Sequence, residues 1–221
     1  MKKLLLTLII ALGAVCGVRA VDLHAIQVDV TMNPSNYRAL LERFLNGDNT
    51  LTQDQMSTVY YGYSFTPDYD PRETYERVSK AYIDKDYERT LSLAQLAMMA
   101  NPVSLELNID ALAAAEKLKD TDNQVLAAHL GSRCDLIANT ILESGRGTSA
   151  DNPFQVINST DIDRLMHNIF GVDKIIGKTT VGEIIAVKFT FPGNDRQHIL
   201  YFDNSRERQF LKDNPATEPG K

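Results

Sequence analysis

The stretch of this chain whose side chains could do chemistry is residues 60–71, which hold five aromatic rings and two acids. Aromatic side chains with a polar group are common where a protein surface binds a sugar ring or a peptide. A hydrolase or a glycan-binding module could act through such rings and the neighbouring carboxylates. The candidate ligand-binding residues are therefore Tyr61, Tyr63, Asp68, Tyr69 and Asp70.

The same rings have a second interpretation, in which they pin a long loop onto a pair of helices. Gly62, Pro67 and Pro71 interrupt any helical or strand period, which predicts an ordered loop. A loop of this length inside a compact domain needs packing of its own. We favour pinning and expect a mixed outcome, with Tyr60 buried and Tyr63 or Tyr69 at the surface.

Other residues could bind a metal or act as a nucleophile, but the sequence shows no third metal ligand and no histidine base near them. Asp163 and His167 lie four residues apart on one predicted helix face, with Asp161 nearby, but such a pair more often forms a surface ion pair. Cys134 beside Arg133 could be a thiol of low pKa, although a cysteine on a helix is usually a small buried apolar residue.

No catalytic motif stands out in the rest of the sequence. His24 and His198 are isolated, and His129 lies in an apolar helix as an expected core or boundary residue. A nucleophile elbow, a zinc-ligand set and a nucleotide fingerprint are all missing from the sequence. We therefore predict no catalytic residue, no metal and no cofactor, although paired acids leave no local pattern and an enzyme stays possible.

Residues 46–52 faintly resemble a calcium-binding loop. Phe44, Asn49 and Gln55 stand where such a loop needs a carboxylate, a glycine and a bidentate glutamate. A hard cation requires that charge, so we favour a polar loop between two helices.

Net charge argues against one class of partner. The chain carries a formal net charge of −6, and no local basic stripe is visible. Proteins that follow a phosphate backbone depend on clustered Lys and Arg. We expect a protein partner and no nucleic acid.

Residues 1–20 have the pattern of a signal peptide. Lys2 and Lys3 precede an apolar run that is too short to span a bilayer, and the segment ends in the small residue Ala20. Cys16 would permit a lipoprotein anchor, but Val15 stands where lipidation sites have a small residue. We expect export to the periplasm or the extracellular space, with no stable membrane span after cleavage.

Cleavage after Ala20 would leave Cys134 as the one remaining cysteine. An intramolecular disulfide could not form, so stability must come from packing.

The N-terminal part of the mature chain predicts helices after a short lead-in. Residues 21–31 alternate loosely in polarity, which suits a short strand or an extended segment. Asn33-Pro34 begins a helix that Asn46-Gly47 ends. A capping box from Thr52 to Gln55 opens the next helix. The expected buried residues of these two helices are Tyr37, Leu40, Leu41, Phe44, Leu45, Met56, Val59 and Tyr60.

Residues 72–139 repeat themselves at a constant shift, which places Lys85-Asp86 on Lys119-Asp120. This period suits units of two antiparallel helices that bury their apolar faces by stacking. We predict four helices, with Asn101-Pro102 ending the second and starting the third, and the fourth running over about 123–142. Their expected inward residues are Tyr75, Val78, Ser79 and Tyr82, then Leu91, Ala94, Leu96 and Ala97, then the alanines of 111–115, then Leu126, Leu130, Ile137 and Ile141.

This region resembles tetratricopeptide repeats, chiefly over residues 72–102. Asp86-Tyr87, Ala97 and Pro102 have that family's spacing. The resemblance implies stacked helix pairs. Two units form little of the concave surface in which many members of the family bind a peptide tail.

Composition changes at Gly145, where residues 145–153 have the glycine and proline content of a linker. Strands are expected at 154–157 and 172–179, and an antiparallel hairpin is expected from 183–191 and 198–202. A helix over 161–170 and a frayed tail from Asp213 complete this part. The residues expected on the core face of this helix are Ile162, Leu165, Met166, Ile169 and Phe170.

A second resemblance covers most of the mature chain. It rests on Leu51-Thr52 leading to Tyr60-Tyr61-Gly62-Tyr63, on Asn152-Pro153-Phe154 and on Leu200-Tyr201-Phe202. These motifs are similar to those of a family of exported Bacteroidetes proteins of this size that carry a domain of unknown function. That resemblance implies no activity, ligand or catalytic residue.

Together these patterns predict an α+β protein, in which N-terminal tetratricopeptide-like helix hairpins pack with a small C-terminal antiparallel sheet and helix. The expected parts are a signal peptide at 1–20, a helical region at 21–144, an α+β region at 145–212 and a flexible tail at 213–221. We expect an exported, non-catalytic binding or scaffolding protein of the cell envelope. The alternative is a hydrolase or glycan-binding module that uses residues 60–70.

Overall fold

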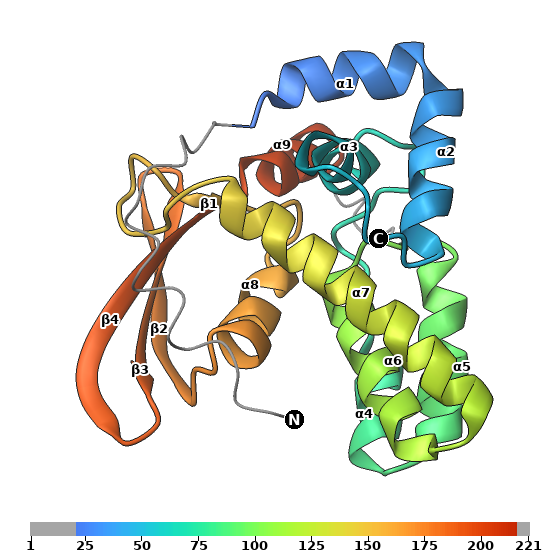
Figure 1. The fold of residues 1–221 in the computed structure, drawn as a ribbon. Helices are drawn as coiled ribbons and strands as arrows, with labels where there is room; N and C mark the ends of the chain where they lie inside the picture. The colour runs from blue at the N-terminus through green and yellow to red at the C-terminus, as the bar shows by residue number, and fades with distance from the viewer. Residues whose placement is uncertain (1–20, 216–221) are drawn as a thin grey trace, which may run out of the picture. The chain divides into compact units, whose positions relative to one another are not determined.

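The computed structural model describes residues 21–215, which form two compact units (Figure 1). A helical unit comprises residues 22–140 and 210–215, and a mixed unit comprises residues 141–209. The division falls inside helix α7 (Thr121–Glu143) and inside helix α9 (Ser205–Asp213). The mixed unit adds a four-stranded sheet to a largely helical chain, so the predicted α+β class is confirmed.

The first helix, α1 (Leu23–Met32), occupies the segment that was expected to be extended, so that expectation is wrong. Asp22 caps it by accepting a hydrogen bond from the Ala25 N–H at 2.9 Å. Val30 is buried against Gly62, where an added Cβ would come within 2.8 Å of the valine side chain. The alternation of apolar residues suggested a strand, but a cap and close helix packing determine the conformation.

Helices α2 (Pro34–Leu45) and α3 (Gln53–Tyr63) begin where the sequence predicts. Pro34 stands at the first helical position of α2, where its missing N–H costs nothing. The capping box of α3 is present, because Gln55 N–H donates to Thr52 Oγ1 and Thr52 N–H donates to Gln55 Oε1. Buried side chains of these helices include Tyr37, Leu40, Phe44, Met56, Val59 and Tyr60.

Four further helices complete the helical unit: α4 (Glu76–Ile83), α5 (Tyr87–Met98), α6 (Leu105–Leu118) and α7. Figure 1 shows α4, α5 and α6 side by side with the N-terminal half of α7. Their shared core is lined largely by small and branched residues, which allow close approach of helices. The core includes Tyr75, Val78, Leu91, Ala94, Met98, Leu107, Ala111, Ala114, Ala115 and Leu130.

Two details of this region differ from expectation. Leu96 was placed on the inward face of α5 but is 66% exposed. Helix α6 begins at Leu105 behind the cap Ser104, and not at Pro102. The cause is local, because the Asn108 side chain donates to the carbonyls of Pro102 and Ser104 and holds the preceding turn outside the helix.

The mixed unit contains β1 (Phe154–Gln155), β2 (Lys174–Val181), β3 (Ile184–Phe191) and β4 (Asn194–Asp203) in the order β1-β4-β3-β2. The β3–β4 hairpin is antiparallel as predicted, and β2 pairs with β3 in the same way. However, β1 pairs with β4 in parallel, so the sheet is mixed and the expectation of an antiparallel sheet is wrong at this edge. A parallel pair needs a long connection, and the segment between β1 and β4 provides one, since it contains helix α8 (Thr160–Arg164) as well as β2 and β3.

The predicted helix over 161–170 is present as α8 (Thr160–Arg164), which continues as a π-helical turn over Leu165–Ile169. Phe170, which directly follows this turn, packs against the sheet: the Phe154 ring of β1 lies 6.1 Å from Phe170 and 5.7 Å from Phe202 of β4 between ring centroids. Helix α9 was missed, because its residues are mostly charged and leave few apolar positions to show a helical period.

Glu207 on α9 stabilises the start of α8. Its carboxylate accepts from the Ser159 N–H at 2.7 Å and from the Ser159 hydroxyl at 2.9 Å. A buried acid at a helix N-terminus compensates the unpaired N–H groups there.

The predicted signal peptide and Cys16 lie outside the described residues, and so does the predicted tail from residue 216 onward. Within residues 21–215, no helix has the length and hydropathy needed to cross a bilayer.

Candidate functional site

The aromatic segment, which comprises residues 60–71, belongs to the helical unit, and most of its rings are buried there. Helix α3 continues through Tyr60, Tyr61 and Tyr63, so the expectation that residues 60–63 belong to a loop is wrong. Tyr60 and Tyr61 are 0% and 1% exposed. Tyr63 is 3% exposed and Tyr69 is 4% exposed, so the expectation that one of them would stand at the surface is wrong. Phe65 is half-buried. This burial corresponds to the pinning interpretation, and these five residues form no pair of exposed rings on which a sugar could stack.

Hydrogen bonds and ring contacts fix the segment, which sequence patterns could not show. The Tyr63 hydroxyl lies 3.0 Å from the Asp68 carbonyl and 2.9 Å from the Ala100 carbonyl. The Tyr69 ring packs edge-on between Tyr63 at 5.8 Å and Phe210 at 5.1 Å. Burial is the main cause that raises the pKa of Tyr63.

The two acids of the segment have different surroundings. Arg72 binds both oxygens of Asp70, at 2.8 and 2.7 Å, and these hydrogen bonds lower the pKa of the Asp70 carboxyl. Asp68 is exposed. A carboxylate held by a guanidinium is stabilised in its charged form, which is unfavourable for a general acid.

The remaining sequence candidates also have structural partners. Asp163 pairs with Lys178 at 2.6 Å, while the His167 Nδ1 lies 2.8 Å from the Val172 carbonyl, so the two side chains serve separate contacts. Across residues 21–215, no three His, Cys, Asp or Glu side chains gather as metal ligands would. Cys134 is buried, and burial raises the pKa of its thiol to about 12, which describes an inert thiol.

His129 was expected at the core or its boundary, but its side chain is exposed. The backbone of His129, and not its ring, lies nearest to Gly47 of the loop between α2 and α3.

The loop between α2 and α3, residues 46–52, is docked on α7. The Ser132 hydroxyl donates to the Gly47 carbonyl at 3.0 Å, and the Arg133 guanidinium donates to the Leu45 carbonyl. Gly47 has a φ of +69°, and an added Cβ there would lie 3.2 Å from the His129 Cα. Only glycine combines this backbone conformation with such a close approach at little cost.

Asp48, the acid of the calcium-like loop, is bound within the loop. Hydrogen bonds from Thr50 and then from Arg43 lower the pKa of its carboxyl to about 2. Its oxygens lie 2.6 Å from the Thr50 hydroxyl and 2.8 Å from the Arg43 Nε. The polar interhelical loop favoured from the sequence fits these contacts.

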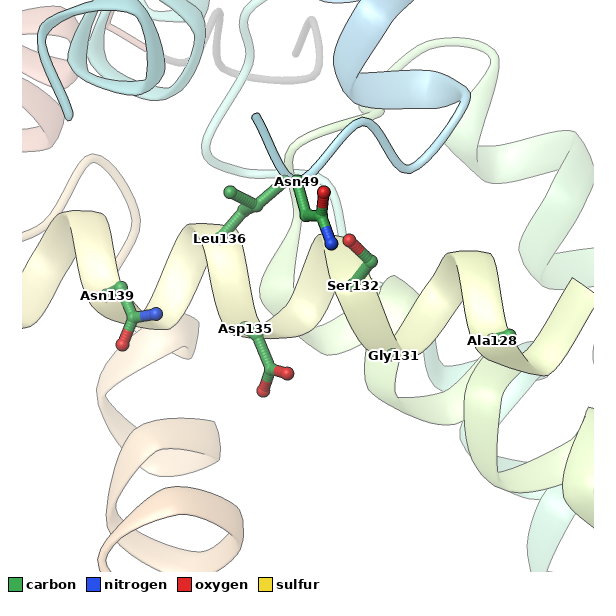
Figure 2. Close-up of a pocket in the computed structure, with 7 residues that line it drawn as sticks. All are labelled: Asn49, Ala128, Gly131, Ser132, Asp135, Leu136 and Asn139. Carbon is green, nitrogen blue, oxygen red and sulfur yellow. The ribbon is translucent and has the colours of Figure 1, made fainter. Parts of the chain in front are cut away.

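Where this loop meets α7, the surface has a hollow of about 490 Å³ (Figure 2). Its lining includes the small residues Ala128, Gly131 and Ser132 of α7. Figure 2 shows Asn49 from the loop pointing toward Ser132, while Asp135 and Asn139 project from α7 farther along the helix. We call this surface the α7 groove; its full lining is Asn49, Ala128, Gly131, Ser132, Asp135, Leu136 and Asn139.

Asp135 is the one ionisable residue of the α7 groove. Asp135 is exposed, and partial desolvation raises the pKa of its carboxyl. Among the described residues, no hydrogen bond or ion pair engages the side chains of Asp135, Asn49 or Asn139. They are therefore available to a ligand, offering one negative charge and two carboxamides.

Sequence reasoning missed the α7 groove. One signal was present: Gly131-Ser132, Asp135 and Asn139 form a small and polar stripe on a helix whose other face carries Leu130, Ile137 and Ile141. That stripe alone reads as an ordinary solvated face. The hollow also needs Asn49, which is far from Gly131 in the sequence and is positioned by a loop contact that has no local sequence pattern.

The comparisons with known proteins give a family and no activity. Residues 24–212 match a family described as a domain of unknown function, DUF4919. Searches of curated proteins and of solved structures returned no significant match. Export and the bacterial group implied by the resemblance stay predictions. The match spans most of the chain, and the chain therefore belongs to the DUF4919 family, whose name describes a domain of unknown function.

Proposed function

We propose that this chain is a non-catalytic binding protein of the cell envelope and that the α7 groove is its contact site. The observation that carries the proposal is a hollow lined by three polar side chains that have no partner among the described residues, two of them on helix α7 and one on the loop docked against it. Sites on helices hold their groups more firmly than sites on loops. The envelope location rests on the predicted signal peptide.

The chemistry of the groove favours binding over catalysis. The hydroxyl of Ser132 donates to the Gly47 carbonyl, and no histidine, cysteine or second acid lines the hollow. Nucleophilic catalysis requires a base within hydrogen-bond reach of the nucleophile, and acid–base catalysis by carboxylates generally uses a pair. Asp135, Asn49 and Asn139 can instead hold a ligand by hydrogen bonds and charge.

The test is affinity capture from envelope extract with the exported form of the chain and two variants of Gly131. An added Cβ at Gly131 meets nothing within 4 Å, so side chains can be placed there without disturbing the fold. Gly131→Trp fills the hollow, and Gly131→Ala is the matched control. We expect a partner that the wild type and Gly131→Ala retain and that Gly131→Trp loses.

Equal retention by Gly131→Trp would reject the α7 groove as the contact site. A panel of hydrolase substrates, assayed in parallel, tests the alternative of a hydrolase. Activity that disappears in Asp68→Asn or Asp70→Asn would replace the proposal with that alternative.

A further inference from the structure

We propose that the ligand of the α7 groove is an extended peptide segment that carries a lysine or arginine side chain, with its cation on Asp135. This inference rests on the proposed function and specifies the chemistry of the ligand. The groove lies on α7, the second helix of the α6–α7 pair.

Charge gives the first reason. Asp135 is the only charged group of the lining, and no cation of the described chain neutralises it. Asp135 is exposed, so a lysine or arginine of a ligand can reach its carboxylate and form a charge-assisted hydrogen bond with it. An anionic ligand would face the same carboxylate and be repelled.

Hydrogen bonding gives the second reason. The carboxamides of Asn49 and Asn139 each offer one acceptor and two donors. A peptide backbone presents the complementary carbonyl and N–H at every residue. The lining holds no aromatic ring, and aromatic rings are the usual platform for a sugar.

Dimensions give the third reason. Ser132 and Asn139 are seven residues apart on α7, a rise of about 10 Å along the helix axis. An extended peptide advances about 3.3 Å per residue, so about three residues would fit along the groove. The missing side chain at Gly131 leaves the backbone of such a segment room to approach the helix.

The first experiment selects peptides from a phage-displayed heptapeptide library on the exported form of the chain, with counter-selection on Gly131→Trp. We expect enriched sequences that contain a lysine or an arginine at a fixed position. Enrichment without a basic residue, or no enrichment, would overturn the inference. Peptides that bind Gly131→Trp as well as the wild type would instead overturn the proposed site, so the two failures can be told apart.

The second experiment measures the affinity of a selected peptide by calorimetry. Asp135→Asn should weaken it about tenfold, equivalent to one charge-assisted contact. Asp122→Asn, which removes an exposed acid of the same helix outside the groove, should leave it unchanged. Replacing the basic residue of the peptide by norleucine should cause the same loss with the wild type and no further loss with Asp135→Asn. Additive losses would show that the cation binds elsewhere.

Discussion

Lys85 and Lys119 are aligned by the sequence period of residues 72–139, and both adopt the left-handed backbone conformation, with φ values of 62° and 58°. Each lies at the end of the first helix of a helix hairpin, and the aspartate that follows caps the second: Asp86 accepts from Arg89 N–H and Asp120 accepts from Asn123 N–H. The two turns therefore use the same local chemistry at the period seen in the sequence. The tetratricopeptide likeness as a whole stays a prediction.

Replacing either lysine by glycine should raise the free energy of unfolding by about 1 kcal/mol, because residues with a Cβ are strained in this conformation. Lys80→Gly, in the middle of α4, should lower it by about 1 kcal/mol. Urea denaturation measures all three variants. A loss of stability in both Lys85→Gly and Lys119→Gly would contradict the turn assignment.

The aromatic segment should contribute strongly to stability. Truncation of Tyr61, Tyr63 or Tyr69 to alanine should cost on the order of 3 kcal/mol, because each ring is almost fully buried. Phe65→Ala should cost less, since that ring is half-buried. Thermal melts provide the measurement, and uniformly unchanged melting temperatures would reject pinning.

Buried tyrosines should make the fold sensitive to alkali. Burial is the largest cause that raises the pKa of Tyr37, Tyr63 and Tyr75. Unfolded tyrosines ionise near pH 10, so above that pH the unfolded state binds fewer protons than the folded state and stability falls. Each such group adds a slope of about 1.4 kcal/mol per pH unit.

Denaturation curves between pH 8 and pH 11 test this expectation, with Tyr37→Phe as the informative variant. Removal of one ionising group should make the alkaline decline shallower. An unchanged slope would mean that the Tyr37 hydroxyl reaches solvent in the folded state.

Two glycines next to the α7 groove should respond in opposite directions to the same substitution. Gly47→Ala should destabilise the chain by about 1–2 kcal/mol, because its φ is positive and its Cβ would press on the backbone of His129. Gly131→Ala should stabilise it by up to about 1 kcal/mol, because alanine favours a helix and the space is open. Calorimetric melts compare the pair, and destabilisation of both would contradict the open surface at Gly131.

The parts of the fold that the sequence predicts depend on contacts between near neighbours. Pro34 begins α2, and Thr52 with Gln55 caps α3, because those signals act within a few residues. Where contacts come from far along the chain, prediction fails. Tyr69 is covered by Phe210, and α1 is fixed by the close approach of Val30 to Gly62.

The candidate site also depends on contacts between residues that are far apart in the sequence. Asp68 and Asp70 are prominent in the sequence as candidate site residues, yet in the structure Asp70 forms a salt bridge with Arg72. Asp135 and Asn139 carry no motif, and their significance comes from the loop that Ser132 holds against α7. The residue types on α7 alone do not distinguish a solvated helix face from a groove, because the groove also needs the loop that packs beside it.

The most direct test of the central claim is photo-crosslinking in cells that express the full chain. A photoreactive phenylalanine derivative replaces Asn139 in the α7 groove, and the control replaces Arg77, an exposed residue of α4 outside it. We predict a discrete crosslinked adduct from position 139 that Gly131→Trp abolishes, and none from position 77. No adduct from position 139, or the same adduct from both positions, would contradict the claim that the α7 groove binds a partner.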